Sequence, residues 1–312
     1  SGEQIGQLMD RIREQFAMAQ DAEITMEVNP GTASAEKLRN FYTAGINRLS
    51  IGMQSAQAEE LKNLGRIHDF EGFCQVYREA VEAGFTNINV DIMSGLPGQT
   101  LASYRDTLEK VLHLEPMPQH ISAYSLIVEE GTPFAAMAER GELPLPEEET
   151  ERAMYEETIE VLAKYGFHRY EISNYAKAGC ECRHNEGYWQ RKDYLGLGLG
   201  AASLLGKERF SNTSDMQEYL KNSSAPEKIR KNRGLLTRED EMAEFMFLGL
   251  RMTQGVSKKE FQEYFGTAIE NIYGEVLKKY KKQGLLLEES GRIFLSREGI
   301  HVSNAVMADF LL

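Results

Sequence analysis

Residues 47–93 read NRLSIGMQSAQAEELKNLGRIHDFEGFCQVYREAVEAGFTNINVDIM, and this stretch decides the fold. Two short runs rich in apolar residues, Asn47–Gly52 and Ile88–Met93, enclose a segment, Glu71–Ala83, whose apolar side chains recur at helical spacing. Asp69 stands just before that segment, where a helix commonly begins with an N-cap side chain. The stretch therefore predicts a strand, a helix and a second strand, the unit from which parallel sheets are built.

The same alternation continues on both sides of this unit. The predicted strands of the whole series are Glu23–Val28, Asn47–Gly52, Ile88–Met93, His120–Leu126 and His168–Ile172. Helical segments such as Ala35–Ala44 separate them, and Thr100 is a further expected N-cap. The glycines expected to follow helix ends are Gly45, Gly65, Gly84 and Gly166. The chain is therefore predicted to be an α/β protein with a parallel sheet.

The carboxyl-terminal part follows a different pattern. From about Leu235 helices follow one another without strands between them, and Ser257 with Glu260 matches a capping box. A short hairpin around Ser290-Gly291 and a final helix come next, an order that resembles a winged-helix module. The predicted domains are a core at 1–205, a linker at 206–234 and a small, mostly helical domain at 235–312.

Composition limits the classes of function. The 312 residues are 42% hydrophobic, which is enough for a full core, and their net charge of −13 repels phosphate backbones. We therefore expect no nucleic-acid partner and interpret the basic run Lys278–Lys282 as a solvated helix end. Three cysteines predict a reducing compartment, and no stretch has the length of a membrane span or the pattern of a secretion signal. A cytoplasmic protein without an integral membrane segment is predicted.

Polar side chains stand where the predicted strands end. Glu27, Gln54 and Asp91 lie at or near such ends, and Arg66 lies in the loop after a short helix. Each alone is more often a structural polar group. Together they predict an adenosine-type cofactor site, because carboxylates accept from ribose hydroxyls while arginine and glutamine bind carboxylates or an adenine edge. The glycine run at 196–200 lacks the G-x-G-x-x-G spacing and is interpreted as a packing site instead.

Several motifs resemble one known family over essentially the whole chain. They are Glu27–Pro30, Gly45–Ser55, Asn89–Asp91, Gly95–Thr100, Ile121–Tyr124 and Tyr170–Tyr175. These motifs resemble the radical S-adenosylmethionine family of oxygen-independent coproporphyrinogen III oxidase and its relatives. The resemblance implies a partial parallel β/α barrel of the radical S-adenosylmethionine type, followed by a HemN-type carboxyl-terminal domain. It also implies that four side chains contact S-adenosylmethionine, namely Glu27, Gln54, Arg66 and Asp91.

The segment His184–Trp189 resembles the H-N-x-x-Y-W pattern of the HemW haem chaperone branch rather than the oxidases. This implies a protein that takes up haem and transfers it to haemoproteins, with respiratory proteins at the membrane as acceptors. His184 is the implied haem contact and candidate iron ligand, and Asn185, Tyr188 and Trp189 complete the haem region. The alternative function is an oxygen-independent coproporphyrinogen III oxidase of porphyrin biosynthesis. Whether the protein is a homodimer, and whether it is peripheral to the membrane, stays open.

On chemistry alone, three interpretations of this segment compete. Cys180, Cys182 and His184 occupy alternate positions, which would align them on a strand, but structural zinc usually needs four ligands. A histidine beside aromatic residues is commonly a satisfied structural side chain. Haem would use the imidazole, the flat rings and nearby positive charges for its propionates. Those charges are Arg183, Arg191 and Lys192.

The chain departs from the family at its cluster ligands. The family holds a [4Fe–4S] cluster with a C-x-x-x-C-x-x-C loop after the first strand, and this chain contains no such loop. Cys74 lies on a predicted helix, and Cys180 and Cys182 are only two positions apart, so they do not replace it. We expect that the first two βα units are missing and that the cluster belongs to the intact protein only. Negligible radical activity is predicted for this chain.

Overall fold

The structure, a computed structural model, describes residues 1–311. The chain forms two compact units, Ser1–Glu181 and Cys182–Leu312. Residues 182–205, expected with the core, belong to the second unit, as does the range 206–234, expected as a linker. The residues predicted to contact S-adenosylmethionine therefore all lie in the first unit, and those predicted to contact haem all lie in the second.

The first unit alternates helices with the strands of one six-stranded sheet. Its helices are α1 (Gly2–Gln15), the 3₁₀ turn η1 (Pro30–Thr32), α2 (Ala35–Thr43), α3 (Ala58–Asn63), α4 (Phe70–Glu82), α5 (Leu101–Leu112), α6 (Pro133–Glu139) and α7 (Glu148–Lys164). Its strands are β1 (Thr25–Val28), β2 (Arg48–Gln54), β3 (Ile88–Ser94), β4 (His120–Ser125), β5 (His168–Arg169) and β6 (Asn174–Ala176). The strand order is β1-β2-β3-β4-β6-β5, with β1 to β4 parallel and the last two antiparallel. The sheet does not close into a barrel, and its four parallel strands alternate with helices as predicted.

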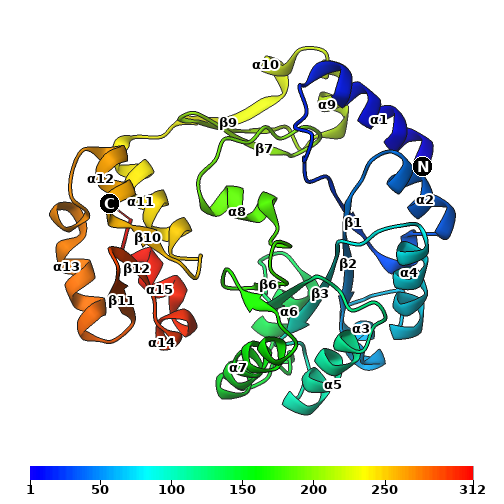
Figure 1. Cartoon of the computed structure of the whole chain (residues 1–312), viewed down its shortest axis with the longest axis horizontal. Coiled ribbons are helices and arrows are strands. Elements are labelled where there is room, and N and C mark those ends of the chain that lie inside the picture. The colour runs from blue at the N-terminus through cyan, green and yellow to red at the C-terminus, as the bar shows by residue number, and fades with distance from the viewer. Residues whose placement is uncertain (312) are drawn as a thin grey trace. The chain divides into compact units, whose positions relative to one another are not determined.

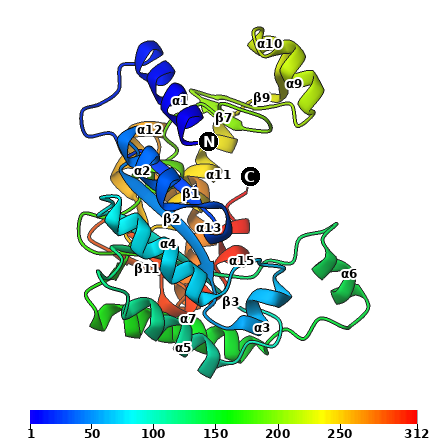
Figure 2. The ribbon, with the colours of Figure 1, turned by 90° about the vertical axis from the view of Figure 1, so that its right-hand side faces the viewer.

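The two faces of this sheet differ in chemistry because strand side chains alternate in direction. Leu49 and Ile51 of β2 and Val90 and Ile92 of β3 are fully buried on one face. They belong to a single core with apolar side chains of α2, α4, α5 and α7. Figures 1 and 2 show α2 and α4 on the same side of β1 and β2. The opposite face, uncovered by these helices, carries the polar strand residues.

The predicted helix boundaries are confirmed by their caps. The Asp69 side chain accepts from the Gly72 N–H at 2.8 Å, and the Thr100 hydroxyl accepts from the Ser103 N–H at 3.1 Å. The four glycines expected after helix ends have φ values between 68° and 110°, a region that favours glycine. Local sequence therefore determines where these helices begin and end.

The last predicted strand of the first unit differs from expectation. His168–Ile172 was predicted as one strand, whereas β5 ends at Arg169 and a second strand, β6, begins at Asn174. The Glu171 carboxylate accepts from the Ser173 N–H at 2.8 Å, which stabilises a turn between the two strands. The chain therefore folds back, and β6 pairs antiparallel with β4 instead of parallel to it.

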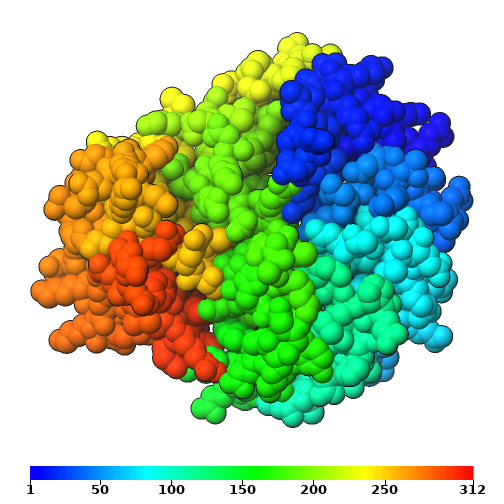
Figure 3. All heavy atoms as spheres, in the orientation of Figure 1, coloured from blue at the N-terminus to red at the C-terminus, as the bar shows by residue number. Residues whose placement is uncertain are grey.

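The second unit holds two small antiparallel sheets and several helices. Its helices are α8 (Arg183–Trp189), α9 (Met216–Asn222), α10 (Pro226–Ile229), α11 (Arg238–Gly249), α12 (Lys258–Phe265), α13 (Ile269–Lys282), α14 (Arg297–His301) and α15 (Ser303–Ala308). Its strands are β7 (Ala202–Leu205), β8 (Glu208–Asn212), β9 (Arg230–Leu235), β10 (Val256–Ser257), β11 (Leu286–Glu289) and β12 (Arg292–Leu295). The sheets have the orders β7-β8-β9 and β10-β12-β11. The winged-helix-like order of α12, α13, the β11–β12 hairpin and α14 is confirmed, and these residues form one continuous orange-to-red mass in Figure 3.

Gly255 allows the turn between α11 and β10. Its φ is +62°, and a Cβ at this position would lie 2.0 Å from the backbone oxygen of Ile293. We expect Gly255→Ala to lower the free energy of unfolding of the second unit by about 2 kcal/mol or more, since strain and overlap add. Urea denaturation followed by Trp189 fluorescence measures this. Gly274→Ala, where a Cβ meets no atom within 4 Å, is the matched control and should not destabilise.

The helices of the described residues are short or polar. The longest, α7, has 17 residues and begins with Glu148 and Glu149. A membrane-spanning helix needs about 20 predominantly apolar residues. Within residues 1–311, accordingly, no helix is able to cross a membrane.

Candidate functional site

Asp91 is the centre of the polar face of the first unit. It lies in the middle of β3 and accepts from Ser50 Oγ at 3.1 Å and from Asn89 Nδ2 at 2.7 Å. Burial raises the pKa of the Asp91 carboxyl, although the hydrogen bonds from Asn89 and from neighbouring hydroxyls lower it. The charge of Glu27, on β1, raises it further. The two carboxylates that the sequence singled out are thus close enough to interact, and Asp91 is held in one orientation.

Gln54 is held in an unusual backbone conformation at the end of β2. Its φ is +68°, and the pairing of β2 with β3 shifts register between Gly52 and Gln54. The Tyr124 hydroxyl donates to Gln54 Oε1 at 2.9 Å, and a Cβ on Gly52 would lie 2.7 Å from Gln54 Nε2. Gly52 therefore leaves the space that the amide occupies. Such conformations in non-glycine residues are costly and concentrate at functional sites.

Arg66 approaches the same edge of the sheet from the loop after α3. One of its terminal nitrogens donates to Asn29 Oδ1 at 3.0 Å, and Asn29 directly follows β1. His68 lies 3.3 Å, through Nε2, from the Met53 carbonyl oxygen, and burial lowers the pKa of this imidazole. Burial also raises the pKa of Tyr124 to about 12, with a further rise from the Asp91 charge and a decrease from Arg66. Tyr124 bonds to Gln54 and is acted on by the charges of Asp91, Arg66 and Glu27. The four residues predicted for one cofactor are therefore grouped around Tyr124 on the polar face.

A chain of hydrogen bonds continues from Asp91 across the polar face. His120 Nδ1 lies 2.6 Å from Asn89 Oδ1, and His120 Nε2 lies 2.9 Å from the Tyr170 hydroxyl. Burial lowers the pKa of His120 well below its usual value, and the Arg48 charge lowers it further. The imidazole is therefore neutral. Because Asn89 donates through Nδ2 to Asp91, its Oδ1 accepts from His120, so Nδ1 carries the proton and Nε2 accepts from Tyr170.

The H-N-x-x-Y-W segment forms a short helix, α8, in the second unit. His184 and Tyr188 are four residues apart and share one helix face. Their ring centroids lie 4.6 Å apart, edge to face, and Tyr188 makes a second edge-to-face contact with Tyr194 at 4.7 Å. His184 is exposed. This face therefore presents an imidazole supported by a row of aromatic rings.

Asn185 and Trp189 share a different face of α8. The Arg251 guanidinium lies 4.2 Å from the centroid of the Trp189 ring, which is a cation–π contact. Trp189 Nε1 is buried and has no hydrogen-bond acceptor among the described residues. The motif is thus divided between an exposed histidine–tyrosine face and a tryptophan that packs within the unit.

Buried ion pairs attach the end of α8 to α11. Arg191, two residues beyond the helix, has a φ of +55° and donates through Nε to Glu244 at 2.9 Å. Arg209 donates to the other oxygen of Glu244 at 2.6 Å, and Lys207 lies 2.7 Å from the Glu241 carboxylate. Both carboxylates are nearly inaccessible, with exposed fractions of 2% for Glu241 and 4% for Glu244. These pairs determine how the segment after His184 lies on the unit.

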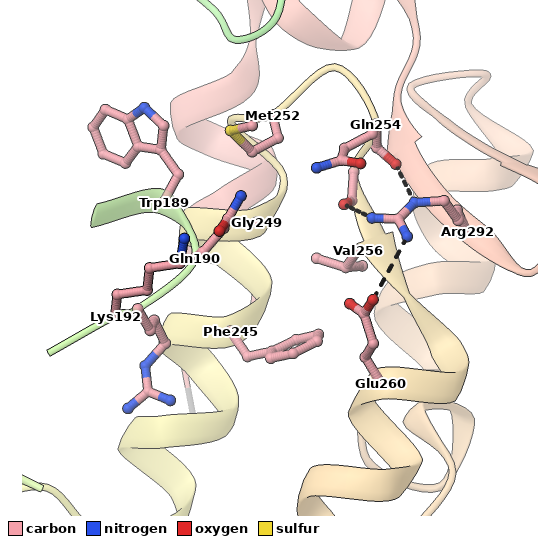
Figure 4. A pocket seen from close by; sticks show the side chains of 12 residues that line it. Trp189, Gln190, Lys192, Phe245, Gly249, Met252, Gln254, Val256, Glu260 and Arg292 are labelled. Carbon is pink, nitrogen blue, oxygen red and sulfur yellow. Dashed lines mark hydrogen bonds and ion pairs between the residues drawn. The ribbon is translucent and has the colours of Figure 1, made fainter. Parts of the chain in front are cut away.

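A cavity of about 370 Å³ lies beside Trp189, as Figure 4 shows. Phe245, Met252 and Val256 provide apolar walls, and Arg292 lies at the far side. Arg292 is already bonded, since it donates to the carbonyl oxygens of Gln254 at 2.8 Å and of Gly255 at 2.9 Å. Among the residues that line this cavity, His184 is absent.

The cysteines do not form a metal site. Cys74 is part of α4, Cys180 follows β6, and Cys182 is the N-cap residue of α8, so the alternating-strand arrangement that zinc required is absent. Among residues 1–311, no group of three or more His, Cys, Asp or Glu side chains is able to hold a metal ion. The residues present therefore do not fit a [4Fe–4S] cluster.

Sequence reasoning missed the partners that hold the predicted residues. Ser50, Asn89 and Tyr124 lie within motifs that resemble the family, but they were not predicted as site residues. His120 and, in the second unit, Glu244 were not predicted either. The alternation of polar and apolar residues in Arg48–Gly52 was an available signal for the polar face. No comparable signal marks Glu244, because its partners come from distant parts of the sequence.

Comparisons with known proteins agree with the motifs. A family model of the radical SAM superfamily matches residues 3–111, and one of the HemN C-terminal domain matches residues 236–302. The Heme chaperone HemW of Bacillus subtilis is 38% identical over all of this chain and 82% of the relative, and that of Lactococcus lactis is 36% identical over 100% and 81%.

Two Escherichia coli proteins extend the comparison. Its Heme chaperone HemW is 34% identical over 95% of this chain and 79% of the relative. The solved structure of its coproporphyrinogen III oxidase HemN has a TM-score of 0.84 at 23% identity, covering 100% of this chain and 74% of the other, which shows the same fold. The resemblance predicted from the H-N-x-x-Y-W segment is confirmed, and the chain belongs to the HemW family of the radical S-adenosylmethionine superfamily.

Proposed function

We propose that this protein is a haem chaperone that takes up haem through the His184 face of α8 and transfers it to haemoproteins. The observation that carries the proposal is the exposed imidazole of His184, supported by Tyr188 and Tyr194. An imidazole is a common haem iron ligand, and aromatic rings pack favourably on a porphyrin. Relatives named as haem chaperones are 34–38% identical, whereas the oxidase is 23% identical, which favours the chaperone over oxidase activity.

The experiment that tests this function is an anaerobic titration of the chain with haem, followed through the Soret absorption band. Saturable binding supports the proposal, and the absence of a Soret change contradicts it. Transfer is tested next by adding an apo-haemoprotein and recording the appearance of its own haem spectrum. We further propose a cytoplasmic location and respiratory haemoproteins at the membrane as the acceptors.

We also propose that Glu27, Gln54, Arg66 and Asp91, on the polar face of the first unit, bind S-adenosylmethionine. Asp91 and Glu27 supply carboxylates for hydroxyl or ammonium groups, and Arg66 supplies a guanidinium for a carboxylate. The amide of Gln54, fixed above Gly52, would contribute an oriented polar group. When bound together with a cluster, S-adenosylmethionine supplies radical chemistry in this superfamily. The cysteines present do not fit a cluster, so these side chains are assigned to binding alone.

Replacing Asp91 by asparagine is expected to weaken the binding of S-adenosylhomocysteine, which needs no cluster, by about tenfold or more. The physical reason is the loss of a charge-assisted hydrogen bond, worth about 1.5–3 kcal/mol. Isothermal titration calorimetry measures the dissociation constant. Asp106→Asn, at a carboxylate that pairs with Lys110 on the outer helix α5, is the control and should bind normally. Equal affinity for the Asp91→Asn variant and the unmodified chain would reject this assignment.

A further inference from the structure

Arg48 is a buried cation that no side chain of the described residues neutralises. It is the first residue of β2, and its exposed fraction is 3%. Its Nε atom is enclosed and has no hydrogen-bond acceptor within residues 1–311. The other buried arginine described above, Arg191, has two carboxylates as partners. Arg48 therefore differs from Arg191, whose charge is paired.

The side chains on which the Arg48 charge acts do not neutralise it. His120 feels the Arg48 charge but is neutral, because burial and that charge both lower its pKa. The Arg48 charge also acts on Cys180, whose thiol pKa is raised by burial and by the charge of Glu181. Glu181 itself pairs with His168 at 2.7 Å. Across the sheet, the backbone of Asn87 accepts from Leu49, and Asn87 Oδ1 is buried without a donor. Among residues 1–311, no carboxylate therefore forms an ion pair with the guanidinium.

A guanidinium in this position is unfavourable unless an anion accompanies it. Arginine does not lose its proton in proteins. Burying an unpaired charge away from water carries a large free-energy cost. A bound anion offsets this cost through charge-assisted hydrogen bonds. The position is distinct from the proposed S-adenosylmethionine site, since Gln54 lies at the other end of β2, about 20 Å away at roughly 3.3 Å per residue.

We propose that Arg48 forms a binding site for a carboxylate at the amino-terminal end of the sheet's polar face. The planar fork of the guanidinium matches the two oxygens of a carboxylate. A singly charged carboxylate leaves the buried pair neutral, whereas doubly charged phosphate would leave an excess negative charge. The Asn87 amide, rotated to present its N–H₂ group, supplies a second donor. This proposal does not depend on haem binding.

The unmodified chain and two variants test the site by calorimetric melting in sodium propionate, sodium phosphate and sodium chloride at equal ionic strength. For the unmodified chain, propionate should raise the melting temperature above the chloride and phosphate values, because binding to the folded state stabilises it. Arg48→Met should melt about 2–4 °C higher than the unmodified chain in chloride, since an uncompensated charge is removed, and should not respond to propionate. Arg39→Met, at an exposed arginine of α2, is the control and should respond as the unmodified chain does.

Hydrogen–deuterium exchange shows which part of the chain propionate stabilises. Propionate should slow exchange in peptides that cover β2 and β3 of the unmodified chain, and not in Arg48→Met. An equal propionate response in Arg48→Met and Arg39→Met would overturn the proposal, because it would mark a general salt effect. If Arg48→Met does not fold, Arg48→Lys decides: it keeps the charge without the fork, so a reduced response supports the site and an undiminished one overturns it.

Discussion

Replacing His184 by alanine is expected to weaken haem binding at least about tenfold and to change the Soret spectrum of the remaining complex. Loss of an axial iron ligand removes the strongest single contact that a protein makes with haem, and tenfold corresponds to about 1.4 kcal/mol. His184 is exposed on α8, and its edge-to-face contact with Tyr188 orients the imidazole ring. The substitution therefore removes a ligand without creating a cavity in the hydrophobic core. Parallel anaerobic titrations of both proteins measure the difference.

His113→Ala provides the matched control for this experiment. His113 is also exposed, but it caps α5 in the first unit, where its Nδ1 lies 2.6 Å from the Glu109 carbonyl oxygen. Its removal should leave the affinity and the spectrum unchanged. If His184→Ala binds haem with the affinity and spectrum of the unmodified chain, His184 is not the iron ligand. An equal loss of haem affinity in His113→Ala would show that the effect is not specific to α8.

Replacing Glu244 by alanine is expected to lower the free energy of unfolding of the second unit by about 3 kcal/mol or more. Glu244 is 4% exposed and binds Arg191 at 2.9 Å and Arg209 at 2.6 Å. Removing one member of a buried pair typically costs about 3–5 kcal/mol, and the variant would leave Arg191 only its more distant carboxylate, Glu241 at 3.7 Å. Arg209 is partly exposed and can return to water, whereas the Arg191 side chain is only 8% exposed. The cost therefore arises mainly from Arg191.

Urea denaturation measures this loss, because Trp189 is the only tryptophan of the chain and belongs to the second unit. Glu263→Ala is the control: Glu263 forms an exposed pair with Lys259 on α12, and such pairs contribute at most about 1 kcal/mol. A loss below about 1 kcal/mol for Glu244→Ala would show that the buried pairs do not stabilise the unit. A large loss would also explain how the segment after α8 keeps its position.

The sequence predicted the parallel part of the fold because short-range signals determine it. In the first unit, apolar periodicity located β2, α4 and β3, and side chains such as Asp69 marked the ends of helices. The β5–β6 turn was missed because a single carboxylate, Glu171, stabilises it through local hydrogen bonds. In the range 206–234, β8 and β9 have many charged residues, so neither shows the apolar alternation of a strand buried on one face.

The candidate site was predictable in its residue types but not in its contacts. Strand ends indicated Glu27, Gln54 and Asp91, but the register that sets Gly52 beside Asp91 depends on the pairing of strands far apart in sequence. The H-N-x-x-Y-W pattern indicated α8 without showing that its two pairs of side chains use different faces. Arg48 was not singled out, because a buried charge without a partner is recognised only from the space around it.

The most direct test of the central claim is the equilibrium titration of the unmodified chain with haem, under anaerobic conditions and without S-adenosylmethionine or reductant. We expect the Soret band to shift and to saturate at one haem per chain, because His184 is the single imidazole that α8 presents. Saturation would establish a haem site that works without a cluster. An unchanged Soret spectrum, or absorbance that rises with added haem without saturating, would contradict the account.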